Sequence, residues 1–498
     1  MSLFSSMTKA SLWRFATMVI RLCVQMGVMI FLARLLSVDE FGELVIAQVV
    51  IGLAAVISEC GMSLGLIQSE NVTDAHVRNA FTLSAALGLT LTGVIAGAAS
   101  PAAAWLGDAQ ATTLIQLISL TFSIDGFSAT ANALLQREFK FRQLAFSETV
   151  AYVAGYGITT CVLVCLGWGV WSLACGYITQ SILRSLLFLG FRPHSIRPLL
   201  SGPELKQLSH FGSGTILARA LNYLAHNADY TLVSRYLGVV ALGWYSRAYQ
   251  MMTLPVYQVG TSLSVALGPA YSRVQNDLVQ VARIHLAATE IIALVMLPIM
   301  AFLAIVAPEI VVCLFGEKWI GSVVPLQILS AAGAPRAITH LGDALLRSRA
   351  KVFTLCWIQT VYAVNVSLGS LVGLQYGIVG VSWGVLAAVC IHYIINSAVC
   401  LIICDISLAR FCRVHIPGLA LGTLVAIFVG SARLLALLYN LPLIGVITLC
   451  AFAAITAFST ILVSRLGISD DVFYKIVVRC RSMFIRQTHL QSPFTEAG

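Results

Sequence analysis

Residues 352–404 read VFTLCWIQTVYAVNVSLGSLVGLQYGIVGVSWGVLAAVCIHYIINSAVCLIIC, 53 positions without an Asp, Glu, Lys or Arg. As one helix this run would be roughly 80 Å long at about 1.5 Å per residue, whereas the hydrocarbon core of a bilayer is about 30 Å thick. The run is therefore predicted to cross a membrane twice, with Gln375-Tyr376-Gly377 as the turn. Its continuity argues against a β-barrel, whose strands are about 10 residues of alternating polarity.

The composition of the whole chain agrees with a membrane environment. Of its 498 residues, 59% are hydrophobic and only 10% are charged, whereas about 25% are charged in an average soluble domain. We therefore expect an all-α, polytopic membrane protein of about 14 transmembrane helices. The expected helices are approximately residues 12–36, 42–67, 77–100, 111–135, 144–167, 170–190, 208–236, 243–269, 284–307, 322–346, 352–374, 377–403, 414–437 and 441–464.

The positions of lysine and arginine predict the orientation. With the N-terminus in the cytoplasm, most of the 30 Lys and Arg residues fall on the cytoplasmic side, as the positive-inside rule requires. On the outer side are only Arg34, Arg235, Lys318 and Arg433. An even number of helices with both termini in the cytoplasm follows. The first apolar segment has no small-residue cleavage site, so we expect it to stay as a helix and not to act as a cleaved signal.

Two sets of residues recur along the chain at nearly the same spacing. The pattern Arg34-x-Leu36-x-Val38-x-x-x-Gly42 returns as Arg235-x-Leu237-x-Val239-x-x-x-Gly243, and six residues between Gln116 and Lys140 match six between Gln327 and Lys351. Leu and Ala are common here and coincidence is the alternative, but two sets in the same order favour duplication. A six-helix repeat keeps its orientation, which predicts two parallel lobes with a substrate site between them. The predicted domains are an N-lobe at 1–200, a C-lobe at 201–410, two extra helices at 411–465 and a basic cytoplasmic tail at 466–498.

Polar residues follow one face of several expected helices, most clearly of helix 208–236. Ionisable residues inside a membrane are costly and usually face a cavity or a partner. Arginine donates bidentate hydrogen bonds to phosphate and stays charged, so a pyrophosphate head group is a suitable ligand. The candidate substrate-binding residues are Arg21, Gln25, Arg219, Asn222, His226, Arg247, Arg336 and His340.

The same charged residues also have a structural interpretation. Arg336 can pair with Asp125 and Arg219 with Asp229, while Arg247 can extend to the outer membrane surface. For any one arginine the two interpretations are evenly matched, but whole polar stripes favour a cavity. Glu59, Asp125, Asp229 and Asp343 are candidates for coupling to protons or sodium, although neutralising an arginine is the commoner role of a single carboxylate. A histidine at a helix contact is likewise commoner than a proton relay.

No enzymatic chemistry is indicated. The chain has no G-x-x-x-x-G-K-[ST], G-x-S-x-G or H-E-x-x-H motif and no soluble region long enough for a catalytic domain. The net charge of +9 is spread between apolar segments, so no nucleic acid is expected as a partner. The cysteine pairs Cys161/Cys165 and Cys400/Cys404 lack nearby His or carboxylate residues, which favours packing over metal binding. We expect neither a cofactor nor a metal.

Several longer segments resemble bacterial polysaccharide-unit flippases. The amino-terminal signature is Phe31-Leu-Ala-Arg-Leu-Leu-Ser-Val-Asp-Glu-Phe-Gly42, followed by Glu59-Cys-Gly-Met-Ser-Leu-Gly-Leu-Ile67. The others are Leu134-Leu-Gln-Arg-Glu-Phe-Lys-Phe141, Asp229-Tyr-Thr-Leu-Val-Ser-Arg-Tyr-Leu-Gly238, Leu242-Gly-Trp-Tyr-Ser-Arg-Ala-Tyr249, Gly268-Pro-Ala-Tyr-Ser-Arg273 and Leu314-Phe-Gly-Glu-Lys-Trp319. Over residues 10–405 the chain is most similar to exporters of succinoglycan-type and colanic-acid-type repeat units, within the multidrug/oligosaccharidyl-lipid/polysaccharide superfamily.

This resemblance implies a function in the bacterial cytoplasmic (inner) membrane. Such proteins move undecaprenyl-pyrophosphate-linked oligosaccharide to the periplasmic leaflet by alternating access. Ion antiport is often proposed as the driving force. A polymerase and its co-polymerase then use the translocated oligosaccharide. The alternatives are a lipid II or drug exporter of the same superfamily, a non-transporting scaffold, or a membrane-embedded polymerase. A drug exporter favours an acidic cavity, and a polymerase favours a long outer loop with paired carboxylates or arginines, which this sequence lacks.

Overall fold

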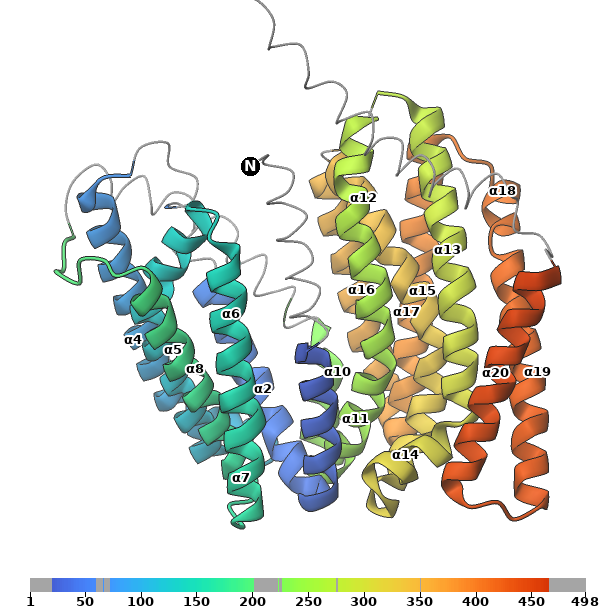
Figure 1. Ribbon diagram of the computed structural model, residues 1–498, viewed down its shortest axis with the longest axis horizontal. Helices are drawn as coiled ribbons and strands as arrows, with labels where there is room; N and C mark the ends of the chain where they lie inside the picture. The colour runs from blue at the N-terminus through green and yellow to red at the C-terminus, as the bar shows by residue number, and fades with distance from the viewer. Residues whose placement is uncertain are drawn as a thin grey trace, which may run out of the picture. The chain divides into compact units, whose positions relative to one another are not determined.

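The computed structural model describes residues 20–59, 66, 72–200, 223, 226–274, 276–349 and 351–464, and the regular structure of this part of the chain is entirely helical (Figure 1). A first helix covers residues 20–35. The later elements are α2 (Val38–Glu59), α4 (Asp74–Trp105), α5 (Ala111–Arg137), α6 (Phe141–Ala151), η1 (Tyr152–Thr159), α7 (Thr160–Cys165), α8 (Trp171–Phe191), α10 (Ala228–Leu237), α11 (Val239–Val256), η2 (Tyr257–Thr261), α12 (Ser262–Arg273), α13 (Leu278–Ile305), α14 (Ala307–Phe315), η3 (Glu317–Ser322), α15 (Val323–Ser348), α16 (Val352–Gly373), η4 (Leu374–Tyr376), α17 (Gly377–Cys404), α18 (Leu408–Arg413), α19 (Ile416–Leu438) and α20 (Leu443–Ser464).

The prediction of an all-α membrane protein is confirmed. Every expected helix range contains helix among the described residues, although range 12–36 is described only from residue 20 and range 208–236 only in its second half. Within the described residues, 8 helical segments are long and apolar enough to cross a membrane. One of them, Phe353–Cys404, contains both α16 and α17. The 26-residue α15 is long enough, but it carries the charges of Arg336, Asp343 and Arg347.

The turn predicted inside the long uncharged run is also confirmed. A short 3-10 helix, η4, joins α16 to α17, and Gly377 has a φ of 66°, which a side-chain-bearing residue rarely adopts. On either side of this turn, Gly369 packs against Gly384 and Gly373 against Gly380, backbone to backbone. These glycines allow the two helices to pack closely as an antiparallel pair.

Three predicted helices are less regular than expected, and one of them, 243–269, contains a π-helical stretch, η2, between α11 and α12. Helix 208–236 is interrupted at Asn227, whose φ of −112° is not helical and whose side chain donates to the Tyr223 carbonyl at 2.8 Å. The backbone N–H of Asn227 donates to the same carbonyl at 3.1 Å, so its side chain and backbone share one acceptor at the interruption. Helix 144–167 contains a π-helical stretch, η1, between α6 and α7. The short helices α14 and α18 were not predicted.

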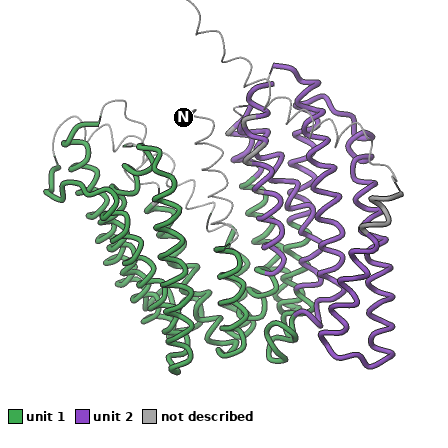
Figure 2. The backbone as a smooth tube through the Cα atoms, in the orientation of Figure 1, with its two compact units in different colours: residues 1–250, 311–325, 359–388 green, residues 251–310, 326–358, 389–498 purple. Residues whose placement is uncertain are grey.

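The chain forms two compact units, each built from separated segments (Figure 2). Unit 1 comprises residues 1–250, 311–325 and 359–388, and unit 2 comprises residues 251–310, 326–358 and 389–498. The lobe boundaries drawn from the sequence stay a prediction. The proposed cytoplasmic tail, 466–498, lies outside the described residues.

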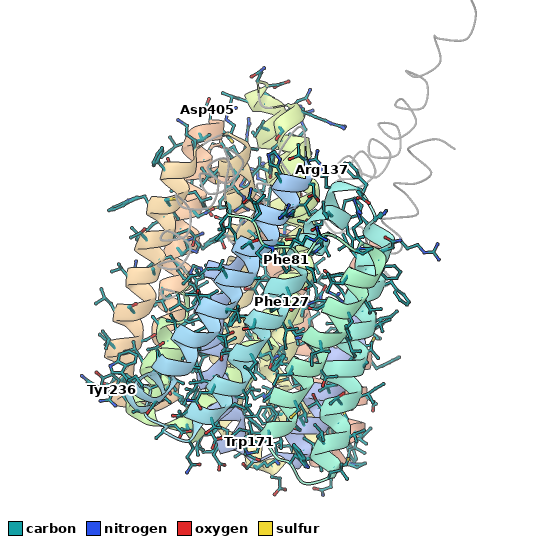
Figure 3. All side chains as sticks on the ribbon, turned by 90° about the vertical axis from the view of Figure 1, so that its left-hand side faces the viewer. Phe81, Phe127, Arg137, Trp171, Tyr236 and Asp405 are labelled. Atoms are coloured by element: carbon teal, nitrogen blue, oxygen red, sulfur yellow. The ribbon has the colours of Figure 1, made fainter. Side chains whose placement is uncertain are left out.

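In unit 1, α4, α5 and α8 pack side by side. Gly88 of α4 meets the backbone of Phe122, and Gly126 of α5 meets the backbone of Ser84, so these two helices cross closely. Figure 3 shows Arg137 at one end of this bundle and Trp171 at the opposite end, with Phe81 and Phe127 between them. Arg137 and Trp171 therefore lie at opposite ends of the layer that α4, α5 and α8 form.

In unit 2, α13 packs against α19, which packs against α20; α19 and α20 are the two extra helices of the sequence prediction. Val306 joins a buried cluster with Leu421, Val425 and Val446. Gly418 of α19 packs on the backbone of Ala293, which brings α19 close to α13. The extra helices therefore belong to the apolar core of unit 2.

Repeat-related residues make equivalent contacts, each inside its own unit. Gln116 of α5 donates to the Ala96 carbonyl of α4 at 3.2 Å, and Gln327 of α15 donates to the Ala304 carbonyl of α13 at 3.1 Å. Both helices also end alike, since the amides of Lys140 and Lys351 each bond the carbonyl five residues earlier at 3.0 Å. These matching contacts support the duplication.

Candidate functional site

Arg247 is a buried cation in α11 of unit 1. Its guanidinium carbon lies 3.8 Å from the centroid of the Phe41 ring and 5.6 Å from that of Trp319. Only 7% of Arg247 is exposed, so it does not extend to the membrane surface. Its Nη1 donates to Gln250 at 2.7 Å, while its Nε has no hydrogen-bond partner among the described residues. Burying a cation is costly without a partner, which makes Arg247 a candidate for binding an anion.

Arg21 forms an ion pair that the sequence did not predict. Its Nη2 donates to Glu148 Oε2 of α6 at 2.7 Å, and the two side chains are 37% and 42% exposed. Gln25, one turn farther along the same helix, is half-buried. Because both charged groups are partly exposed, this pair can still reach a polar ligand.

Three tyrosines form a cluster, and the first of them, Tyr152, follows Glu148 by about one helical turn. Within η1, Tyr152 and Tyr156 stack with ring centroids 5.0 Å apart, and Tyr177 of α8 follows at 5.7 Å from Tyr156. Gln48 of α2 donates to the Tyr177 hydroxyl at 3.1 Å. The Arg247 charge acts on the hydroxyls of Tyr156 and Tyr177. Arg21, Arg247 and the tyrosines therefore share one electrostatic environment inside unit 1.

The local sequence explains how the tyrosines meet. Gly155 lies against the backbone of Gln180, and Gly176 lies against Thr160 Oγ1 and the Gly155 carbonyl, so η1 and α8 approach closely. A π turn interrupts the regular side-chain register of a helix and often occurs at functional sites. Tyr152, Tyr156 and Tyr177 were not among the residues predicted from the sequence, although two tyrosines at i, i+4 beside glycines are a recognisable signal.

Asp125, a predicted coupling residue, is already neutralised in unit 1. Its Oδ2 accepts from Arg184 of α8 at 2.5 Å and its Oδ1 from Ser181 at 2.7 Å. The partner suggested by the sequence was Arg336, whereas the observed partner is Arg184. Arg184 was missed because it lies at the end of an uncharged stretch and was counted as cytoplasmic.

Asp229 lies in the first turn of α10, directly after the break at Asn227. It is only 1% exposed, and its Oδ2 accepts from the Tyr245 hydroxyl at 2.8 Å. His226 packs edge-on against Tyr362, with ring centroids 5.2 Å apart. Arg219 and Asn222 lie outside the described residues, as does the Glu59 side chain.

The remaining candidates lie in unit 2, on α15. Arg336 follows Pro335 and is half-buried, and His340, one turn later, packs against Tyr257 with centroids 6.1 Å apart. Asp343 is 8% exposed and accepts from Asn396 of α17 at 3.0 Å. The predicted polar face of this helix is therefore present.

Three of the four basic residues expected outside have structural partners. Arg34 donates to the carbonyls of Cys313 and Leu314 at the end of α14, and Lys318 donates to that of Arg34 at 3.1 Å. Arg433 of α19 pairs with Glu309 of α14 at 2.6 Å. Cations near helix C-termini are favourable. These exceptions to the positive-inside rule thus have a structural cause.

Outside the spans, one carboxylate joins the ends of two helices. Glu138 follows α5 and accepts from Lys140 and from Arg192, each at 2.6 Å. The hydrogen bond from Lys140, followed by that from Arg192, lowers the pKa of Glu138 from its ordinary 4.5. The described residues contain no group of three or more His, Cys, Asp or Glu side chains that can hold a metal ion.

Comparisons with known proteins agree with this architecture. Residues 31–324 match the family model described as "Polysaccharide biosynthesis protein". The lipopolysaccharide biosynthesis protein WzxC of Escherichia coli (strain K12) is 26% identical over 409 residues, which cover 80% of this chain and 81% of WzxC. The succinoglycan biosynthesis transport protein ExoT of Rhizobium meliloti (strain 1021) is 25% identical over 288 residues, 58% of each chain.

Two solved structures show which fold this is. A lipid II flippase, MurJ, in an inward closed conformation matches with a TM-score of 0.72 at 16% identity, covering 91% of this chain and 99% of MurJ. An inward-facing multidrug resistance MATE family transporter of the MOP superfamily matches with a TM-score of 0.63 at 16% identity, covering 78% of this chain and 99% of the transporter. At such identities the likeness establishes the fold alone.

Proposed function

Because this chain belongs to the polysaccharide biosynthesis protein family, whose model matches residues 31–324, we propose that it flips undecaprenyl-pyrophosphate-linked oligosaccharide repeat units across the membrane. The protein is a multi-pass membrane transporter and not an enzyme. Its substrate enters exopolysaccharide or lipopolysaccharide biosynthesis, as the names of WzxC and ExoT suggest.

The single observation that carries the proposal is the buried Arg247, whose guanidinium has a donor to spare. A pyrophosphate supplies the acceptors that this cation lacks, and arginine binds phosphate with fixed, planar geometry. The residues proposed from the sequence, Arg21, Gln25, Arg219, Asn222, His226, Arg247, Arg336 and His340, stay the proposed substrate set.

A drug exporter is the weaker alternative. Such a site needs carboxylates that attract organic cations. Asp125, Glu148 and Glu309 are each paired with an arginine, and the buried Asp229 and Asp343 accept hydrogen bonds from Tyr245 and Asn396. A lipid II flippase also binds a pyrophosphate, so only the identity of the substrate distinguishes lipid II export from the proposed function. Ion coupling through Glu59, Asp125, Asp229 or Asp343 is a further part of the proposal.

We place the protein in the bacterial inner membrane with both termini in the cytoplasm and a polymerase with its co-polymerase as periplasmic-side partners. Truncated fusions test the orientation. A periplasm-dependent alkaline phosphatase joined after Tyr376 is expected to be active, and a green fluorescent protein joined after Cys412 is expected to fluoresce. The reverse pattern contradicts the orientation.

The function is tested in a deletion strain. Secreted polysaccharide and lipid-linked repeat units on each leaflet are quantified together. Completed units trapped on the cytoplasmic leaflet, with little polymer outside, support flipping. Completed units that reach the periplasmic leaflet but stay unpolymerised assign the protein to a polymerase or scaffold role, and accumulation of lipid II assigns it to peptidoglycan.

A further inference from the structure

The stacked tyrosines of η1 lie deep in the membrane-spanning part of unit 1. Tyr152 follows Phe141, the start of this membrane-spanning segment, by 11 residues, or about 16 Å of helix, which is near the middle of a hydrocarbon core about 30 Å thick. Glu148, one helical turn earlier in the same segment, pairs with Arg21, and both side chains are partly exposed. Charged residues inside a membrane usually face a cavity or a partner and not lipid, so we infer that the space beside this pair is polar.

Buried polar atoms without partners belong to the ion pair and to residues three positions from Tyr152 and from Tyr177. Within the described part of the chain, Arg21 Nε, Thr149 Oγ1 and Gln180 Oε1 are buried and make no hydrogen bond. Each such atom in a folded protein needs an explanation, and a polar ligand is one. Arg247, 93% of which is inaccessible, adds its own unpartnered Nε to this environment.

Aromatic rings beside hydrogen-bonding groups are the chemistry that binds sugars. A pyranose presents C–H groups on its faces, which suit the negative face of an aromatic ring, and hydroxyls on its rim, which need donors and acceptors. Tyr152, Tyr156 and Tyr177 supply three successive rings, and Arg21, Glu148 and Gln180 supply the polar groups. Tyrosine hydroxyls extend the polar rim.

We propose that Tyr152, Tyr156 and Tyr177 form a saccharide subsite, which holds the sugar part of the substrate beside the cationic groups. This inference rests on the proposed function and names the part of the substrate that each group binds. The tyrosines hold neutral sugar rings, and Arg247 holds the charged pyrophosphate.

Binding to the purified, full-length protein in lipid nanodiscs tests the subsite. The first probe is the oligosaccharide released by mild acid from the lipid-linked units that the deletion strain accumulates. The second probe is undecaprenyl diphosphate without sugar. We expect Tyr156→Ala to weaken oligosaccharide binding about tenfold, because it removes the central ring, and to leave undecaprenyl diphosphate binding unchanged.

Matched variants separate the subsite from folding. Tyr376→Ala removes a tyrosine that is 75% exposed in η4 and is expected to bind both probes normally. The double variant Tyr152→Phe/Tyr156→Phe keeps both rings and is expected to lose about threefold, since only hydroxyl hydrogen bonds are lost. It decides the question if Tyr156→Ala does not fold.

Two outcomes overturn the inference in different ways. If the wild-type protein binds the oligosaccharide and the double variant and Tyr156→Ala bind it equally well, the subsite is wrong while the flippase function stands. If the deletion strain exports normally, so that no lipid-linked units accumulate, and the wild-type protein does not bind undecaprenyl diphosphate, the proposed function fails, and the subsite fails with it.

Discussion

Gly42 of α2 lies against the backbone carbonyl of Val239, and Gly243 of α11 lies against the backbone carbonyl of Val38. Gly42 and Gly243 occupy the same position of the repeated pattern, and so do Val38 and Val239. A reciprocal contact between repeat-related residues is what a two-fold relation between the two copies produces. The first turns of α2 and α11 therefore contact each other across a local two-fold axis.

This contact predicts that neither glycine tolerates a side chain. In Gly42→Ala the new Cβ meets the Val239 backbone, which cannot move aside easily, so we expect a loss of roughly 1–3 kcal/mol of stability. Gly243→Ala is expected to behave alike. Thermal unfolding of the purified protein measures the effect.

The control for these variants is Gly97→Ala in α4, where nothing lies within 4 Å of the added atom. Alanine favours a helix over glycine by about 1 kcal/mol, so this variant should be neutral or more stable. Equal melting temperatures for Gly42→Ala and the wild type contradict the close contact.

The helices themselves were predictable from the sequence, because uncharged runs longer than a bilayer must turn back. The turn at Gln375-Tyr376-Gly377 and the ends of α16, α17, α19 and α20 follow from such runs and their flanking charges. The interruption at Asn227 could not be predicted, because it depends on whether the Asn227 side chain bonds the Tyr223 carbonyl or faces elsewhere.

The partners of the charged residues were harder to predict. Periodicity places Asp125 and Arg21 on polar faces, but it does not say which helix lies opposite. Arg184 and Glu148 come from neighbouring helices whose rotation the sequence does not fix. The tyrosine cluster was missed for the same reason, because Tyr177 joins Tyr152 and Tyr156 only through the close packing of α8 on η1.

The Asp125–Arg184 pair predicts compensation between two variants. Asp125→Asn leaves Arg184 without its carboxylate and is expected to cost roughly 1–2 kcal/mol, less than a fully buried pair because each side chain is 32% exposed. The double variant Asp125→Asn/Arg184→Gln should recover most of this stability, which thermal unfolding measures.

The same double variant examines the coupling role of Asp125. If the carboxylate serves only to neutralise Arg184, export by the double variant keeps the ion dependence of the wild type. Loss of that dependence, with stability restored, would show that Asp125 carries the coupling ion.

Glu138 predicts a specific response to acid. Its pKa is lowered in the folded protein by Lys140 and Arg192, so its contribution to stability is present above pH 4.5 and is lost as the pH falls through the folded pKa. Glu138→Gln should therefore lower the melting temperature at neutral pH and flatten its decline below pH 4.5. Glu317→Gln, at an exposed position in η3, is the control, and an unchanged acid profile in Glu138→Gln argues against the interaction.

Arg247 predicts opposite effects on stability and on function. No carboxylate of the described residues pairs with it, and its guanidinium lies over Phe41. Replacing an unpaired buried charge by an apolar side chain of similar length is often neutral or stabilising. Arg247→Met should therefore melt at the same or a higher temperature than the wild type, yet lose export, because the substrate pyrophosphate loses its donor.

Arg247→Lys distinguishes charge from geometry. Lysine keeps the positive charge but has neither the planar stack on Phe41 nor the fork of donors, so we expect export and undecaprenyl diphosphate binding to fall about tenfold. Arg283→Lys, at an exposed position in α13, should leave both unchanged. If Arg247→Met melts at a lower temperature and Arg247→Lys exports normally, Arg247 is a packing residue, and the anion site must be sought among the other arginines of the proposed set.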